Sequence, residues 1–213
     1  MTLSTYLLYL AAVALLVLSP GPTMLMCMTS SLQHGPRKAL AAAAGSVSAV
    51  LGTMLLSALG LGALLAASEA AFWILKAAGA AYLIWLGIKT FRSSTTVFDS
   101  MPAAVTAPQA ATPARRLFVQ GLIVGGSNPK ALLFFTAFFP QFLNPAAAWA
   151  PQFVVLAATF VAMEFSVLTL CTLGVARLAP ALRSGTRMRW FNRISGGLFT
   201  LMGTLLLATR RTA

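Results

Sequence analysis

The 213-residue chain is 59% hydrophobic and only 8% charged, whereas an ordinary soluble domain carries about 25% charged residues. Its mean hydropathy is +0.85, and no charged residue precedes Arg37, so the composition excludes a soluble globular domain. The formal net charge of +12 does not indicate a nucleic-acid partner, because the basic residues form short clusters between apolar runs and not a continuous stripe.

Six apolar runs have the length of a membrane-crossing helix, which needs about 20 residues. They cover residues 4–32, 39–67, 70–91, 117–141, 151–176 and 192–209. A bilayer admits only helices or closed barrels, and these runs do not alternate apolar and polar residues as barrel strands do. The sequence therefore predicts an all-α integral membrane protein with six transmembrane helices.

A proline-rich tetrad, residues 19–22 with the sequence SPGP, interrupts the first run near its middle. Its two prolines have no N–H to donate to the carbonyls of Leu16 and Leu18, so we expect the helix to break and leave acceptors free at membrane depth. Such a break persists only where it is buried in protein or lines a wet cavity. An ordinary proline kink used for packing is the alternative. We assign substrate binding to Ser19, Pro20, Gly21 and Pro22.

A stretch rich in Ser, Thr, Ala and Pro separates two halves with three runs each. We interpret residues 93–114 as a cytoplasmic linker between a first three-helix repeat, 1–92, and a second, 115–213. Weak self-similarity supports the repeat, since Ser19-Pro20 aligns with Asn128-Pro129 at one offset. A three-span unit enters the membrane from opposite sides in its two copies, so the expected architecture is an inverted repeat of the kind found in secondary transporters.

The fourth run carries a second break and a charge. Pro129 frees the carbonyl of Gly125, and Lys130 lies near the centre of the run, where a lysine costs about 2.5–3.5 kcal/mol unless it faces protein or water. We expect Lys130 to attract a substrate carboxylate or to pair with an acid; a lysine that snorkels to the interface is the alternative. Substrate binding is assigned to Asn128, Pro129 and Lys130.

Small and aromatic residues flank this second break. Gly121 and Gly125 form a GxxxG pattern that permits close helix packing. Five phenylalanines follow Lys130, and we expect them to pack within the protein or against lipid, with a gate as the alternative: Phe134, Phe135, Phe138, Phe139 and Phe142.

Glu164 is the second ionisable group at depth, in the middle of the run 151–176. Lys130 and Glu164 would each cost less if they were close together. We hypothesise that Glu164 carries a coupling proton or binds the substrate amine. A purely structural Lys–Glu pair is the alternative.

The basic residues predict the orientation. Eleven Lys and Arg residues fall on one side of the six-span arrangement: Arg37, Lys38, Lys89, Arg92, Arg115, Arg116, Arg177, Arg183, Arg187, Arg189 and Arg193. The other side takes three: Lys76, Arg210 and Arg211. By the positive-inside rule the linker 93–114 and the basic loop 177–193 are cytoplasmic, and both termini lie outside.

Residues for catalysis or metal binding are scarce. The chain has one His and two isolated cysteines, Cys27 and Cys171, and no Ser/His/acid group, metal cluster or phosphate loop. We expect no enzymatic activity, no catalytic residue, no cofactor and no metal, and we interpret the cysteines as small buried hydrophobes.

Three segments carry a resemblance to a known family. In chain order they are SPGPTMLMCMTSSLQHGPRKALAAAAGSVSAVLG, AAGAAYLIWLGIKTFR and GLIVGGSNPKALLFFTAFFPQFL. In this order, over essentially the whole chain, they resemble the LysE/RhtB family of amino-acid exporters.

The resemblance implies a multi-pass protein of the bacterial inner membrane that exports an amino acid or a related metabolite, driven by protons or the membrane potential. The expected partners are the small substrate, membrane lipid and protons, without nucleic acid; the small-residue faces suit a homo-oligomer as well as packing within one chain. Two alternatives stay open. A passive pore would need a continuous polar lining, and a non-transporting scaffold would have no use for broken helices at the midplane.

Overall fold

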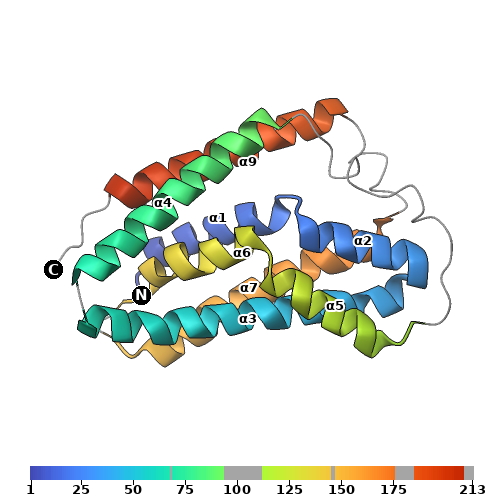
Figure 1. Cartoon of the computed structure of the whole chain (residues 1–213), viewed down its shortest axis with the longest axis horizontal. Coiled ribbons are helices and arrows are strands. Elements are labelled where there is room, and N and C mark those ends of the chain that lie inside the picture. The colour runs from blue at the N-terminus through green and yellow to red at the C-terminus, as the bar shows by residue number, and fades with distance from the viewer. Residues whose placement is uncertain (68, 94–111, 145–146, 176–184, 209–213) are drawn as a thin grey trace.

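The computed structural model describes residues 1–67, 69–93, 112–144, 147–175 and 185–208, and within them every regular element is a helix. Figure 1 shows the helices side by side along one long axis. The first half holds α1 (Leu3–Leu18), α2 (Pro22–His34), α3 (Pro36–Ala67) and α4 (Glu69–Arg92). The second holds α5 (Ala114–Gly126), α6 (Pro129–Leu133), η3 (Phe134–Phe138), η4 (Phe139–Phe142), α7 (Trp149–Leu173) and α9 (Gly185–Ala208).

Both expected breaks are present. The pair α1 and α2 bends by 48°, with Ser19 and Gly21 in extended conformation and Pro22 in the first turn of α2. The pair formed by α5 and Pro129–Phe142 bends by 53°, where Asn128 caps α6. In each case a proline is the first residue of the second helix. Its fixed φ suits a first turn, and the backbone N–H that it lacks is not needed there.

Four candidate spans lie within the described residues. Two single helices, Pro36–Gly60 and Trp149–Leu173, are long and apolar enough to cross a membrane. The two bent pairs each qualify if the pair is one span. The helices agree closely with the six apolar runs, while membrane crossing by α4 and α9 stays a prediction.

The fourth run ends differently from the regular helix that we expected. After α6 the chain passes through a π-helix, η3, and a 3-10 helix, η4. Pro140 lies inside η4 and has no N–H to donate to the carbonyl of Thr136. The regular α-helical ladder is therefore interrupted at this point, and the chain takes up the irregularity in these two short segments.

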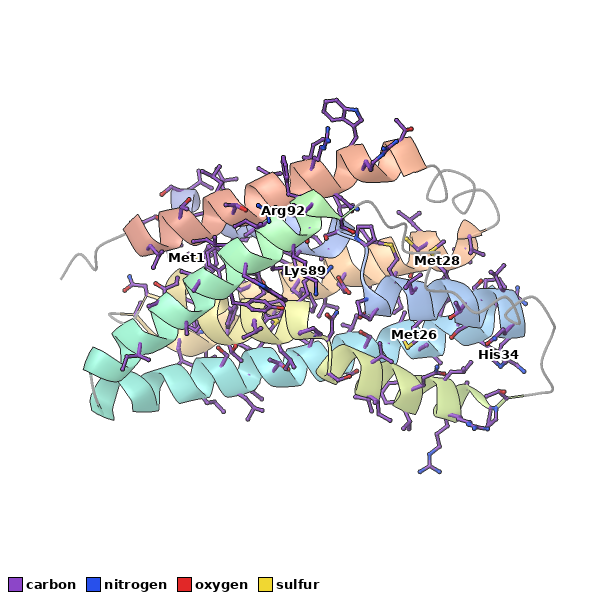
Figure 2. The ribbon with its side chains drawn as sticks, turned by 45° about the horizontal axis from the view of Figure 1, so that its top comes forward. Met1, Met26, Met28, His34, Lys89 and Arg92 are labelled. Atoms are coloured by element: carbon purple, nitrogen blue, oxygen red, sulfur yellow. The ribbon has the colours of Figure 1, made fainter. Side chains whose placement is uncertain are left out.

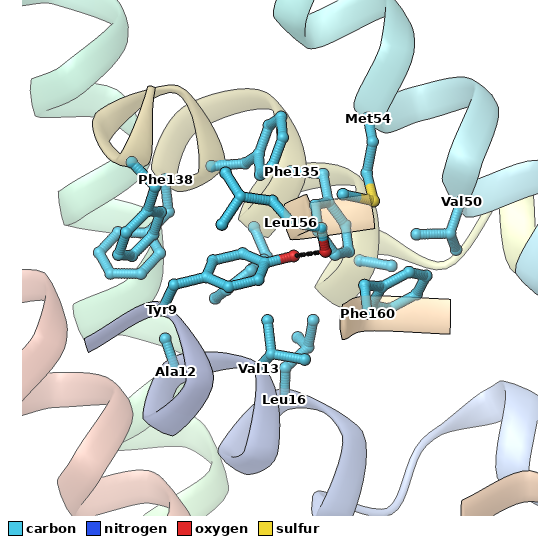
Figure 3. Packing of buried hydrophobic residues seen from close by; sticks show 14 of the residues in the cluster. Tyr9, Ala12, Val13, Leu16, Val50, Met54, Phe135, Phe138, Leu156 and Phe160 are labelled. Carbon is cyan, nitrogen blue, oxygen red and sulfur yellow. Dashed lines mark hydrogen bonds between the residues drawn. The ribbon is translucent and has the colours of Figure 1, made fainter. Parts of the chain in front are cut away.

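The aromatic band packs inside the protein. All five phenylalanines are at most 5% exposed, which confirms packing within the protein and excludes lipid contact. Figure 3 shows Tyr9 of α1 among them, with its hydroxyl donating to the carbonyl of Leu156 in α7 over 2.9 Å. The rings of Tyr9 and Phe142 meet edge to face at 5.1 Å between centroids. This cluster joins α1, η3, η4 and α7 on one side of the two breaks.

Glycines allow two close helix crossings. A Cβ on Gly45 of α3 would overlap the carbonyl oxygen of Phe118, and one on Gly121 of α5 would overlap that of Ala42. The expectation that the GxxxG pattern permits close packing is confirmed. A second crossing joins α4 and α9, where a Cβ on Gly203 would lie 2.8 Å from the carbonyl oxygen of Ala80.

The basic ends of several helices lie at the same end of the bundle. Helices α3, α5 and α9 begin at this end, whereas α1 begins at the opposite one (Figure 1). Arg37 and Lys38 are in the first turn of α3, and Arg115 and Arg116 in that of α5. Lys89 and Arg92 belong to the last turn of α4, which lies nearer the middle of the long axis than His34 does (Figure 2). This distribution agrees with the charge bias of the sequence.

Candidate functional site

The two breaks meet at a small cavity. It measures about 20 Å³ as the space open to the centre of a water molecule, and a space of at least about 10–15 Å³ on this measure holds one water. A free amino acid does not fit. The lining comes from both breaks, from α3 and from α7, and consists of Leu16, Val17, Ser19, Gly21, Thr23, Met24, Val50, Asn128, Lys130, Ala131, Phe160, Glu164 and Leu168.

Lys130 reaches from the second break to the first. Its Nζ donates to the carbonyl oxygen of Leu16 over 2.8 Å and to that of Ser19 over 2.6 Å. The Leu16 carbonyl is one of the acceptors that the tetrad was expected to free, and Lys130 satisfies it. The ammonium also lies at the C-terminal end of α1, where the helix dipole favours a positive charge. An ammonium has three donors, so one of them is without an acceptor among the described residues.

Asn128 holds the two breaks together. Its Oδ1 accepts from the backbone N–H of Lys130 over 3.1 Å, and its Nδ2 donates to the hydroxyl of Thr23 over 3.2 Å. We expected the Gly125 carbonyl to be free, and this prediction is wrong. The carbonyl accepts from the backbone N–H of Asn128 over 3.3 Å. The turn tightens after α5, and this bond replaces the one that Pro129 cannot make.

Glu164 faces the same cavity from α7. The structure thus brings Lys130 and Glu164 together, as the cost of each charge at depth led us to expect. Among the described residues Glu164 has no hydrogen bond, and no ion pair joins it to Lys130, whose Nζ donates to two carbonyls. Its carboxyl oxygens are therefore available to a ligand.

Five of the eight predicted site residues line the cavity, and three do not. Ser19, Gly21, Asn128, Lys130 and Glu164 do so. The three prolines do not line the cavity: Pro20, Pro22 and Pro129. Pro22 and Pro129 are the first residues of α2 and α6, and Pro20 lies between α1 and α2.

Sequence reasoning missed several lining residues. Thr23 is only 5% exposed and stands directly after Pro22, a position that offered a signal because the first turn of a helix presents donors. Val50, Phe160 and Leu168 are apolar residues on α3 and α7, and nothing in their local sequence distinguishes them from the rest of the core.

Some expectations lie wholly or partly outside the described residues. The linker is described only at its ends, and residues 176–184 of the basic loop are not described. Across the described part of the chain no group of three or more His, Cys, Asp or Glu residues could hold a metal ion. The two cysteines are buried and unbridged, in agreement with the interpretation as small hydrophobes.

Fold and site together define a helical membrane protein with two broken helices around a small cavity of mixed charge. The model of the family described as LysE type translocator matches residues 14–210, and the chain belongs to this family. No solved structure matches the chain.

Curated relatives are similar over most of their length. The chain is 37% identical over 210 residues to a homoserine/homoserine lactone efflux protein of Salmonella typhimurium, covering 99% of each chain. It is 32% identical over 161 residues to a leucine efflux protein of Klebsiella pneumoniae, covering 75% of this chain and 74% of that protein. An uncharacterized membrane protein of Vibrio cholerae is 33% identical over 211 residues, 99% of this chain and 100% of that protein.

Proposed function

We propose that this protein is a secondary active exporter of a small neutral amino acid or a close derivative. The observation that carries the proposal is that one cation and one anion, Lys130 and Glu164, face a single cavity between two broken helices. A zwitterion offers a charge of the opposite sign to each. The names of the relatives, homoserine, homoserine lactone and leucine efflux proteins, support this substrate class.

Each charged group has a proposed role. The free donor of Lys130 attracts the substrate carboxylate, while the carbonyls of Leu16 and Ser19 hold its other two donors. Glu164 accepts from the substrate amine or carries a coupling proton. Asn128 holds the two breaks together through its hydrogen bond to the Thr23 hydroxyl.

The size of the cavity requires movement. A space for about one water cannot hold an amino acid, so binding has to open the site toward one side of the membrane at a time. We propose alternating access between two inverted three-helix repeats, residues 1–92 and 115–213. The basic helix ends face the cytoplasm and both termini lie outside, in the inner membrane of a bacterium.

The experiment that tests the function is efflux from cells loaded in turn with homoserine, leucine and other amino acids, under an imposed pH gradient. Wild type should accelerate the efflux of one or a few of them, and Lys130→Ala should abolish the acceleration at matched membrane abundance. Lys89→Ala is the matched control. Lys89 belongs to the last turn of α4, and its Nζ lies 4.8 Å from the ring centroid of Trp85. Efflux no faster than in empty cells for every substrate would reject the proposal.

The same experiment separates the alternatives. A passive pore would release substrates only down their gradients, and a scaffold would release none. Uphill movement that follows the pH gradient or the membrane potential distinguishes an exporter from both.

A further inference from the structure

Thr23 presents a hydroxyl to the cavity with its proton unused. The residue is 5% exposed and lines the cavity. Its Oγ1 accepts from Asn128, which fixes the oxygen and leaves the O–H to donate elsewhere. Within the part of the chain that the structure describes, the Thr23 hydroxyl proton has no acceptor.

The first turn of α2 offers further unused donors at the same place. Gly21 precedes α2 in an extended conformation, and no side chain caps the helix. The first backbone bond of this turn runs from the N–H of Leu25 to the carbonyl of Gly21 over 3.1 Å. Among the described residues the N–H groups of Thr23 and Met24 are without an acceptor. An uncapped helix N-terminus with its dipole favours an anion.

The Lys130 ammonium lies against the same turn. A Cβ built on Gly21 would be 3.3 Å from Nζ, so the ammonium and the start of α2 are neighbours. Ser19, which is 5% exposed and lines the cavity, adds another hydroxyl, and this hydroxyl makes no hydrogen bond among the described residues. Donors therefore gather at the first break, while the carboxyl of Glu164 supplies the acceptors from α7.

We propose that the space beside Gly21 is the carboxylate subsite of the exporter, and that Thr23 is its specificity-determining residue, with its hydroxyl donating to the substrate carboxylate. The inference rests on the proposed function and deepens it. A hydrogen bond to a charged group is about twice as strong as one to a neutral group. Loss of the Thr23 hydroxyl should therefore weaken the binding of an amino acid more than the binding of the corresponding lactone or ester.

The test compares an amino acid with its lactone or ester, which keeps the amino group and lacks the carboxylate. Wild type, Thr23→Val and Thr23→Ser are reconstituted in vesicles, and half-saturation is measured for homoserine, homoserine lactone, leucine and leucine methyl ester. Thr23→Val should raise the substrate concentration at half-maximal transport about tenfold or more for the acids. For the lactone or the ester the same concentration should rise about threefold. Thr23→Ser, which keeps a hydroxyl, should stay within about threefold of wild type.

Two further variants control for structure. Thr172→Val removes a fully buried hydroxyl that donates to the carbonyl of Leu168 over 2.6 Å; Leu168 lines the cavity but Thr172 itself does not. This variant should leave the acid-to-ester ratio unchanged. Thr23→Ala replaces Thr23→Val if the latter does not fold, and should change the ratio in the same direction. A second readout is the shift of melting temperature on adding each ligand to purified protein.

The outcomes are distinguishable. Equal weakening of acid and ester by Thr23→Val, or failure of Thr23→Ser to restore acid affinity, would overturn the carboxylate subsite while wild-type export still stands. Absence of wild-type transport for all four compounds would reject the exporter and the subsite with it. A changed acid-to-ester ratio that serine restores is the result that we expect.

Discussion

Replacing Gly121 with alanine probes the closeness of α3 and α5, the crossing that leads into the second break. The added Cβ would overlap the carbonyl oxygen of Ala42 and lie 2.9 Å from its carbon and 3.0 Å from the nitrogen of Ser46. An ordinary contact of a Cβ is 3.4–4 Å. The neighbours are helix backbone, which cannot rotate away as a side chain does, so the two helices have to separate.

The expected cost follows from two opposing effects. Overpacking a closed interface costs about 1–3 kcal/mol, and a backbone neighbour places Gly121→Ala near the upper end. Alanine recovers about 1 kcal/mol through its higher helix propensity. The net loss is about 2 kcal/mol, which lowers the melting temperature of a chain of this size by about 4–8 °C.

The melting temperature is measured in detergent with a dye that reacts with exposed thiols, because Cys27 and Cys171 are buried and free. Gly52→Ala on α3 is the matched control, since a Cβ there meets nothing within 4 Å; it should be neutral or stabilising by up to about 1 kcal/mol. If Gly121→Ala melts within about 1 °C of Gly52→Ala, the close crossing is refuted.

Three further changes test the site and its surroundings. Gly21→Ala places a methyl group 3.3 Å from the Nζ of Lys130, so half-saturation should rise severalfold while the melting temperature stays close to wild type; an unchanged half-saturation would contradict the contact. Tyr9→Phe removes a buried hydrogen bond to α7 and should cost about 1 kcal/mol of stability, read as a lower melting temperature. Glu164→Gln cannot exchange a proton, so efflux should no longer respond to an imposed pH gradient; an undiminished response rules out proton coupling through this residue.

The positions of both helix breaks could be predicted because their cause is local. A proline lacks the N–H that the helix needs, whatever surrounds it, so the tetrad at Pro20 and the Asn128-Pro129 pair marked the breaks from the sequence alone. The irregular end of the fourth run also has a local cause in Pro140, but several helical forms satisfy that constraint. Pro140 alone therefore does not select the π-helix followed by a 3-10 helix that the structure shows.

The partners of the site residues could not be predicted, because they are distant in sequence. Lys130 bonds to Leu16 across 114 positions, and Asn128 bonds to Thr23 across 105. The sequence indicated a free acceptor at Leu16 and a lysine that needs hydrogen-bond acceptors. No local pattern predicted that Lys130 donates to the Leu16 carbonyl. The position of Thr23 after Pro22 indicated the first turn of a helix, but only the fold shows that Thr23 lines the cavity.

The charges of the site are unequally satisfied, and this inequality bears on the proposed substrate. Lys130 already has two carbonyl partners and the dipole of α1, whereas the Glu164 carboxyl has no hydrogen bond within the described residues. A neutral zwitterion would supply an amine to the carboxyl and a carboxylate to the remaining donors, and it would leave the net charge of the cavity unchanged. A substrate with a second charge would add an uncompensated charge at membrane depth, which is costly. The charge balance therefore favours homoserine or leucine over lysine or aspartate as cargo of the proposed exporter.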